Sequence, residues 1–250
     1  MRTTLVAGNW KLHKTVPEAL ELAGQLRESL GNFAGTDLLV CPAFPALKPV
    51  ADALSGTGIA VGGQDLFYED TGAFTGEVSG PMLRSAGCAF VIVGHSERRQ
   101  FFGDTGKTVN RKIGAALASG LVPIVCIGEP LEKREHNVTK EFLRKQVEET
   151  FAGLGEAEID RLVVAYEPIW AIGTGRTATP AIAEETQRFV RELFGIRYGE
   201  AAARLRILYG GSVKPSNAAE LIAGEDIDGF LVGGASLDAA SFAGIARACV

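Results

Sequence analysis

The chain has 250 residues, of which 46% are hydrophobic and 22% are charged, and its formal net charge at pH 7 is −5. This is an ordinary globular composition, long enough to bury a large core without disulfides, and it argues against a disordered protein. The negative charge disfavours nucleic acid and anionic membranes as partners, but it leaves room for a small anion held by local charge and backbone N–H groups.

The four cysteines are widely separated, with no C-x-x-C pair and no spacing typical of a metal site; they are Cys41, Cys88, Cys126 and Cys249. Three of them lie in apolar runs, so we expect buried, reduced thiols and a reducing compartment. The first residues show no signal-peptide pattern, and no apolar run reaches the roughly 18 residues of a membrane span. The sequence therefore predicts a soluble cytoplasmic protein.

Short apolar runs alternate with helical patterns along the chain. The runs are nearly continuous in apolar residues, which is typical of parallel strands covered on both faces. In chain order, the predicted strands are residues 5–10, 38–41, 59–63, 89–94, 122–128, 162–167, 205–210 and 229–233.

Amphipathic segments with start and stop signals lie between these strands. Residues 16–31 predict a helix with Pro17 near its start and Gly31 at its end. Its apolar face is predicted to consist of Leu20, Ala23, Leu26 and Leu30. Residues 140–151 predict a helix with a charged outer face, and Thr179 with Pro180 predicts the N-cap and first position of another.

Eight strand–helix units of roughly 30 residues fill the chain, and no linker rich in Pro, Gly or Ser divides it. We therefore expect one α/β domain over residues 1–250, a single (β/α)8 TIM barrel with eight parallel strands. A doubly wound open sheet uses the same alternation and is the alternative. Because the carboxyl ends of the strands form the active face of such a barrel, the residues that follow each strand are the candidates for function.

The first and fourth strands end in residues suited to a ligand. Asn9 and Lys11 follow the first, although a turn asparagine and a surface lysine are individually commoner. His95 follows the fourth, where the start of a helix would disfavour the protonated imidazole. For this histidine, a structural hydrogen bond and a catalytic role both remain open.

The sixth strand ends in a single carboxylate, Glu167, and Pro168 prevents the strand from continuing. The apolar loop that follows has Trp170 at its crest and Gly173 and Gly175 at its close. This pattern indicates a hinged lid over a base that works away from water, and a solvated structural glutamate is the alternative. Residues 173–178 also match the dinucleotide pattern G-x-G-x-x-A, but the strand does not run into these glycines and no helix starts there, so we reject a nucleotide site.

Glycine pairs follow the last two strands, Gly210-Gly211 before Ser212 and Gly233-Gly234. Glycine lets the backbone approach a ligand closely, and barrels of this kind bind phosphate at these strand ends. Such pairs can also be turn material, although two in adjacent strand ends favour a phosphate site.

Taken together, these segments resemble the signatures of the triosephosphate isomerase family, in the family's order and spacing over essentially the whole chain. The matching segments are residues 8–11, 72–79, 94–99, 165–168, 209–213 and 232–237. The resemblance implies interconversion of dihydroxyacetone phosphate and D-glyceraldehyde 3-phosphate through an enediolate, as in glycolysis and gluconeogenesis. It also implies that the reaction needs no cofactor and no metal.

The resemblance further implies a role for each candidate residue. Glu167 would be the base, neutral His95 would polarise the carbonyl, and Lys11 and Asn9 would stabilise the developing negative charge. The phosphate would be held by Asn9, Lys11, Gly173, Ser212, Gly233 and Gly234. Ile172 and Leu231 would cover the base, Ser96 and Glu97 would support the site, and the lid would include Pro168, Ile169, Trp170, Ala171 and Gly175.

The resemblance finally implies a homodimer, in which the loop 64–79 projects into the partner subunit. Gln64, Phe74 and Thr75 would lie in this interface, with the loop tip near the partner's Lys11 and Glu97. The chain departs from the family pattern at Arg176, where lysine is common, and at residues 103–105, where a more acidic stretch is common; neither departure reaches the chemistry.

Two other functions remain as alternatives. A phosphate-binding barrel isomerase of a larger sugar phosphate would share the last two glycine pairs, but not the set of His95, Glu167 and Lys11. A catalytically inactive barrel that serves as a binding module should have lost one of those three, and the sequence retains all of them.

Overall fold

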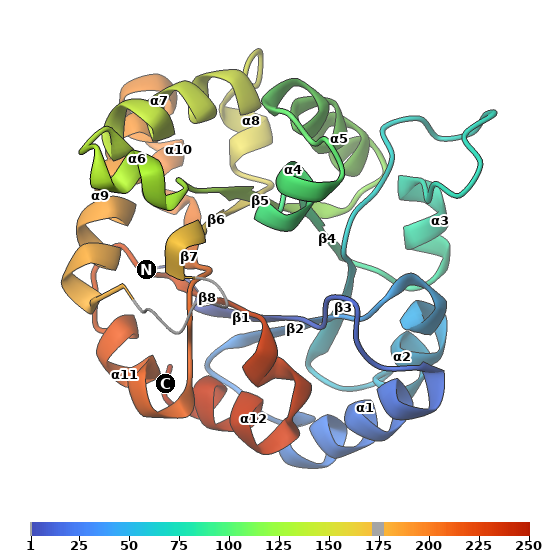
Figure 1. Cartoon of the computed structure of the whole chain (residues 1–250). Helices are drawn as coiled ribbons and strands as arrows, with labels where there is room; N and C mark the ends of the chain where they lie inside the picture. Colours follow the sequence, from blue (N-terminus) through green and yellow to red (C-terminus); the bar gives the residue numbers. More distant parts are fainter. Residues whose placement is uncertain (1, 172–177) are drawn as a thin grey trace.

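A computed structural model describes residues 2–171 and 178–250. Its eight strands form a closed barrel in chain order, and the helices surround it (Figure 1). The closed barrel confirms the predicted fold class and excludes the open sheet. The strands are β1 (Leu5–Asn9), β2 (Asp37–Cys41), β3 (Ile59–Gly63), β4 (Phe90–Val93), β5 (Val122–Ile127), β6 (Val163–Tyr166), β7 (Arg206–Tyr209) and β8 (Gly229–Val232).

The barrel closes because β1 pairs in parallel with both β2 and β8, so that Leu5 has Asp37 and Gly229 as its neighbours in the sheet. Each strand is buried on both faces. One set of side chains forms a cluster of its own, which includes Leu5, Leu39, Ile92, Ile124, Val163 and Leu208. The alternate residues join a larger cluster with the helices. This double burial explains the continuous apolar runs, and every strand end lies within one residue of its predicted position.

The helices follow the strands in turn. They are α1 (Val16–Leu30), α2 (Leu47–Ala53), α3 (Gly80–Ser85), α4 (Ser96–Phe101), α5 (Gly106–Ala118), α6 (Leu131–Glu135), α7 (Thr139–Thr150), α8 (Glu156–Ile159), α9 (Pro180–Tyr198), α10 (Ala201–Arg204), α11 (Pro215–Ile222) and α12 (Ala239–Arg247). Three short 3-10 turns complete the described elements: η1 (Phe44–Ala46), η2 (Ile169–Ala171) and η3 (Gly234–Leu237).

The predicted start of α9 is confirmed, because the Thr179 hydroxyl accepts a hydrogen bond from the Ile182 N–H at 3.3 Å. The predicted apolar face of α1 is wrong at Leu20, which is 39% exposed. The buried face consists of Ala19, Leu22, Ala23, Leu26 and Leu30. A helix has 3.6 residues per turn, so Leu20 falls beside this stripe rather than on it.

The cysteines are free thiols, and Cys41, Cys88 and Cys126 are buried as expected. Within the part of the chain that the structure describes, no helix has the length and apolar character needed to cross a lipid bilayer.

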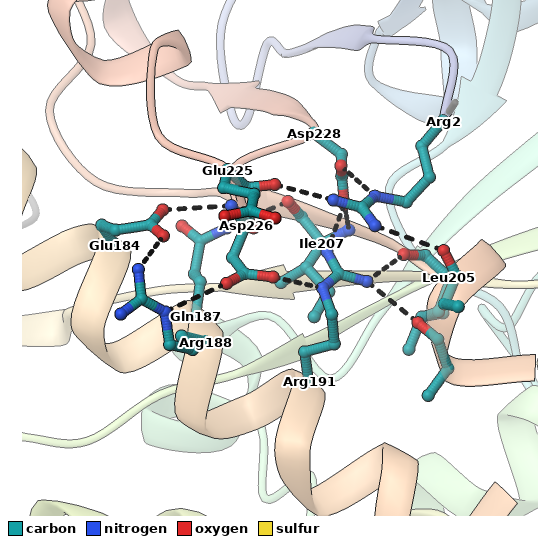
Figure 2. A network of polar contacts seen from close by, with 12 residues as sticks. Arg2, Glu184, Gln187, Arg188, Arg191, Leu205, Ile207, Glu225, Asp226 and Asp228 are labelled. Carbon is teal, nitrogen blue, oxygen red and sulfur yellow. Dashed lines mark hydrogen bonds and ion pairs between the residues drawn. The ribbon is translucent and has the colours of Figure 1, made fainter. Parts of the chain in front are cut away.

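The seam between β7 and β8 is held by side chains rather than by a long backbone ladder (Figure 2). Only Tyr209 and Phe230 pair in register there. Asp228 instead joins the strands, because its N–H donates to the Ile207 carbonyl at 2.9 Å and its carboxylate accepts from the Ile207 N–H at 2.8 Å. Arg191, on α9, donates to Asp228 at 2.7 Å and also binds Asp226. A buried ionic network therefore closes the barrel on the face opposite the strand ends.

The corrected face of α1 leads to a stability prediction. We expect Leu26→Ala to lower the free energy of unfolding by about 2–5 kcal/mol, because Leu26 is fully buried and its loss leaves a cavity. Leu20→Ala should cost less than about 1 kcal/mol, since its side chain is partly in water. Urea unfolding at one fixed protein concentration measures both, and equal costs would contradict the assignment of the face.

Candidate active site

The carboxyl ends of five strands open onto one pocket of about 400 Å³. Its lining contains most of the residues singled out in the sequence and three further ones, Val213, Lys214 and Ala235. The lining residues are Asn9, Lys11, His95, Glu97, Glu167, Gly210, Gly211, Ser212, Val213, Lys214, Leu231, Gly233, Gly234 and Ala235. Residues separated by more than 200 positions along the sequence thus share one cavity.

Glu167 follows β6 directly, and its backbone continues the strand pairing because its N–H donates to the Ile127 carbonyl at 2.8 Å. The residue is 2% exposed. One carboxylate oxygen accepts from the Ser96 N–H at 2.9 Å, and the other lies 2.9 Å from Nε2 of His95. Burial raises the pKa of Glu167, but the adjacent His95 and the Ser96 N–H lower it by more, so the pKa lies below its usual value.

His95 is the N-cap of α4, as the sequence predicted from its place after a strand. The Glu97 N–H donates to Nδ1 of the imidazole at 3.2 Å, so this nitrogen carries no proton and the single proton of the neutral ring lies on Nε2, facing Glu167. Burial lowers the pKa of His95, whereas the charge of Glu167 raises it by more while the carboxylate lies against the ring. The raised pKa therefore depends on the position of Glu167.

Lys11 reaches into the pocket from a strained turn after β1, where its φ of 51° lies in the left-handed region. Its backbone is held on both sides: its N–H donates to the Asn9 side chain at 3.0 Å, and its carbonyl accepts from Gln64 at 2.9 Å. The ammonium binds Glu97 at 2.6 Å. A Cβ on Gly233 would lie 3.7 Å from this ammonium, so Lys11 spans the pocket from β1 to the end of β8.

Two glycines make room for Glu167, and the sequence reasoning had not linked either of them to it. A Cβ on Gly128 would collide with the Glu167 carbonyl, and a Cβ on Gly210 would lie 2.9 Å from Cγ of Glu167. The backbone directly after β5 therefore approaches the backbone of Glu167, and the backbone directly after β7 approaches its side chain, as closely as only glycine permits. The sequence marks each of these positions only as a glycine at the end of an apolar strand, a pattern that an ordinary turn also produces.

The segment after Glu167 is anchored by a glutamate that the sequence reasoning missed. Glu129 is completely buried, and one of its oxygens accepts from the Trp170 indole at 2.9 Å and from the Tyr166 hydroxyl at 3.1 Å. Its backbone carbonyl accepts from the Ile169 N–H at 3.2 Å. Of the predicted lid, Pro168, Ile169, Trp170 and Ala171 are placed here, and Ala171 is buried. Ile172, Gly173 and Gly175 lie outside the described residues.

The loop 64–79 projects from the barrel between β3 and α3 (Figure 1). At its tip the Phe74 ring lies tilted against that of Phe67, with ring centroids 4.5 Å apart, yet Phe74 remains 42% exposed, and Thr75 is exposed beside it. A second hollow of about 340 Å³ adjoins the first pocket and shares Lys11, His95 and Glu97 with it. Its outer lining includes Leu12, Phe44 and Phe102, all exposed hydrophobic side chains.

Within residues 2–171 and 178–250, the structure contains no cluster of three or more His, Cys, Asp or Glu side chains that could hold a metal ion.

The chain is similar to known proteins over its full length. The sequence profile of the family described as triosephosphate isomerase matches residues 4–249. The triosephosphate isomerase of Moorella thermoacetica is 57% identical, with 98% of each chain covered, and that of Carboxydothermus hydrogenoformans is 51% identical over the whole of both chains. The crystal structure of triosephosphate isomerase from Bartonella henselae superposes with a TM-score of 0.90 at 36% identity, covering 98% of each chain.

The hydrogen bond between Glu97 and His95 predicts the tautomer of the imidazole. In the enzyme without substrate at about pH 8, we expect Nε2 to carry the proton and Nδ1 to carry none, because a second proton would face the Glu97 N–H. Nitrogen-15 NMR of labelled histidine distinguishes the two nitrogens, and the exposed His136 supplies a reference signal. Two protonated nitrogens on His95 would contradict this assignment.

Proposed function

The chain belongs to the triosephosphate isomerase family, and from this premise we propose that Glu167, His95, Lys11 and Asn9 carry the isomerisation. The reaction interconverts dihydroxyacetone phosphate and D-glyceraldehyde 3-phosphate through an enediolate. The observation that carries the role assignment is the buried carboxylate of Glu167, 2.9 Å from Nε2 of His95 at the wall of the shared pocket.

The base in this proposal is Glu167. Its hydrogen bonds to His95 and Ser96 favour the ionised carboxylate. When the substrate carbonyl replaces the carboxylate as the acceptor of the Nε2–H hydrogen bond, Glu167 loses the interaction with His95 that lowers its pKa. Burial continues to raise the pKa of Glu167. Substrate binding thus makes Glu167 more basic at the moment when it must accept a proton from carbon.

The acid partner is His95. Its Nε2–H donates to the substrate carbonyl, and the Glu97 N–H keeps Nδ1 as acceptor so that the ring stays neutral. A neutral imidazole can give a proton to one enediolate oxygen and recover one from the other. The Lys11 ammonium and the Asn9 amide stabilise the developing charge in a pocket where water is largely replaced by protein.

The phosphate would lie at the glycine-rich ends of β7 and β8. Ser212, Gly233 and Gly234 line the same pocket as Glu167 there, and Gly173 completes the group by analogy with the family. Leu231 lines the same pocket and would cover the base together with Ile172. Exclusion of water by the lid would protect the enediolate from losing its phosphate.

The chemistry requires no added group. Isomerisation moves one proton between neighbouring carbons and one between neighbouring oxygens, so the substrate as a whole is neither oxidised nor reduced. A general base, a neutral acid and a fixed positive charge supply everything that this transfer needs. We therefore propose a cofactor-independent, cytoplasmic, single-domain enzyme.

The exposed loop 64–79 and the apolar hollow beside Lys11 support a homodimer. Phe74 at the loop tip and the lining residues Leu12, Phe44 and Phe102 are exposed hydrophobic side chains, which are enriched where proteins associate. In the proposed dimer, each loop tip fills the hollow of the other subunit, close to the partner's Lys11 and Glu97. Assembly would therefore complete the wall of the active site.

The activity itself gives the first test of this assignment. With a metal chelator present, we expect the protein to turn over both triose phosphates in a dehydrogenase-coupled assay. Glu167→Gln should lower kcat by about a thousandfold or more, because the amide cannot accept the proton. Glu200→Gln, an exposed change of the same chemistry, should leave kcat unchanged. Lack of turnover by the unmodified protein, or nearly full kcat in Glu167→Gln, would refute the assignment.

Sedimentation tests the dimer. We expect a dimer at micromolar concentration and mostly monomer for Phe74→Glu, because the change would bury a charge in an apolar hollow. Ile196→Glu is the matched control, since Ile196 is 82% exposed on α9, away from this surface. A protein that sediments only as a 26.4 kDa species, or a Phe74→Glu variant that remains fully dimeric, would count against the proposed interface.

A further inference from the structure

The side chain of Arg99, on α4, binds the ends of both β4 and β5, the strands next to His95 and Glu167. The β4–β5 ladder ends at the pair Val93 and Val125, because Gly94 then turns away with a φ of +68°. Beyond this point Arg99 binds both chains: its Nε donates to the Gly94 carbonyl at 2.8 Å and one Nη to the Cys126 carbonyl at 3.2 Å. The guanidinium thus extends the pairing of the two strands after the backbone ladder has stopped.

The Gly94 and Cys126 carbonyls each lie close in the chain to a group that positions His95 or Glu167. Gly94 is joined by its carbonyl to His95. Cys126 precedes Ile127, whose carbonyl accepts the Glu167 N–H at 2.8 Å. A displacement of either strand end would therefore alter the 2.9 Å contact between His95 and Glu167.

The fit between Arg99 and the turn is tight. A Cβ on Gly94 would lie 2.9 Å from the Arg99 guanidinium and 2.8 Å from Val109, so the turn has space for the arginine only because residue 94 is glycine. The guanidinium therefore has one arrangement against this turn rather than several.

The hydrogen bonds of Arg99 go to backbone carbonyls. Among the described residues, no carboxylate lies within 4.0 Å of its guanidinium, whereas the neighbouring Arg98 binds Asp65 at 2.7 Å. Burial lowers the pKa of Arg99, and the negative charges of Asp104, Glu167 and Glu149 oppose this lowering. The role of Arg99 therefore rests on its two hydrogen bonds to backbone carbonyls.

We propose that Arg99 is a positioning residue for the isomerisation, because it ties the ends of β4 and β5 together beside His95 and Glu167. The proposal rests on the roles assigned above to His95 and Glu167. The ionisable groups that face Glu167 are His95, Lys11 and the Cys126 thiol.

Steady-state kinetics over a range of pH test the proposal with two variants. Arg99→Gln removes the charge and one of the two hydrogen bonds, and we expect kcat to fall about ten- to a hundredfold with KM within about twofold. The acid limb of kcat/KM should move to higher pH, because a lengthened contact with His95 lowers the pKa of Glu167 by less. Arg99→Lys cannot span both carbonyls, so kcat should fall and the acid limb should move in the same direction.

Arg161→Gln is the matched control. The Arg161 guanidinium also donates to a backbone carbonyl, that of Leu117 at 2.9 Å, but Leu117 lies at the far end of α5. Loss of this hydrogen bond should lower the free energy of unfolding without changing kcat or the acid limb. An Arg99→Gln variant with unchanged kcat and acid limb would overturn the proposal. If that variant does not fold, Arg99→Lys decides, since full kcat in the lysine variant would also overturn it.

These outcomes are distinct from a failure of the proposed function. If Glu167 is not the base, Glu167→Gln keeps its activity whatever Arg99 does. If only the inference about Arg99 is wrong, Glu167→Gln is inactive and the Arg99 variants behave like the unmodified enzyme.

Discussion

The contact between the buried carboxylate of Glu167 and the imidazole of His95 is the constraint on which the rest of the site depends. A carboxylate that is 2% exposed is costly to ionise unless hydrogen bonds and charges replace the lost water. The structure supplies them from one short segment, with Nε2 of His95 on one oxygen and the Ser96 N–H on the other. Because these donors stand at the start of α4, the proposed base at the end of β6 meets them only if β4, β5 and β6 end at matching heights.

At the opposite face of the barrel, ionic groups stabilise the closure of the sheet. There Arg191, Asp226 and Asp228 join α9 to β7 and β8, and their charges are neutralised within the network. At the carboxyl ends of the strands, the ionisable side chains of Lys11, Glu97 and Glu167 line a cavity, where a ligand could contact them. Stability and reactivity are thus separated to the two ends of the same strands, which is typical of this architecture.

Features that depend on neighbouring residues in the chain could be predicted from the sequence, whereas contacts between residues far apart in the chain could not. The strands were predictable because burial on both faces leaves a continuous apolar run, and the position of His95 was predictable because a helix follows its strand. Leu20 was misassigned because several leucines on α1 offer more than one stripe, and only contact with the neighbouring elements selects the buried one. Glu129, Gly128 and Arg99 act through contacts with residues far away in the sequence, and no local pattern marks such partners.

The contact between Glu167 and His95 also links substrate binding to base strength in the proposed mechanism. The two side chains are paired with each other, so neither polar group is left unpaired in the cavity wall. In the proposed mechanism a substrate carbonyl displaces the carboxylate from Nε2, and the free energy for this step comes from contacts away from the reacting carbons, chiefly those of the phosphate. The displaced carboxylate would stay buried with one partner fewer, which is the condition for a stronger base. The contact between Glu167 and His95 would thereby restrict full basicity to the complex with substrate.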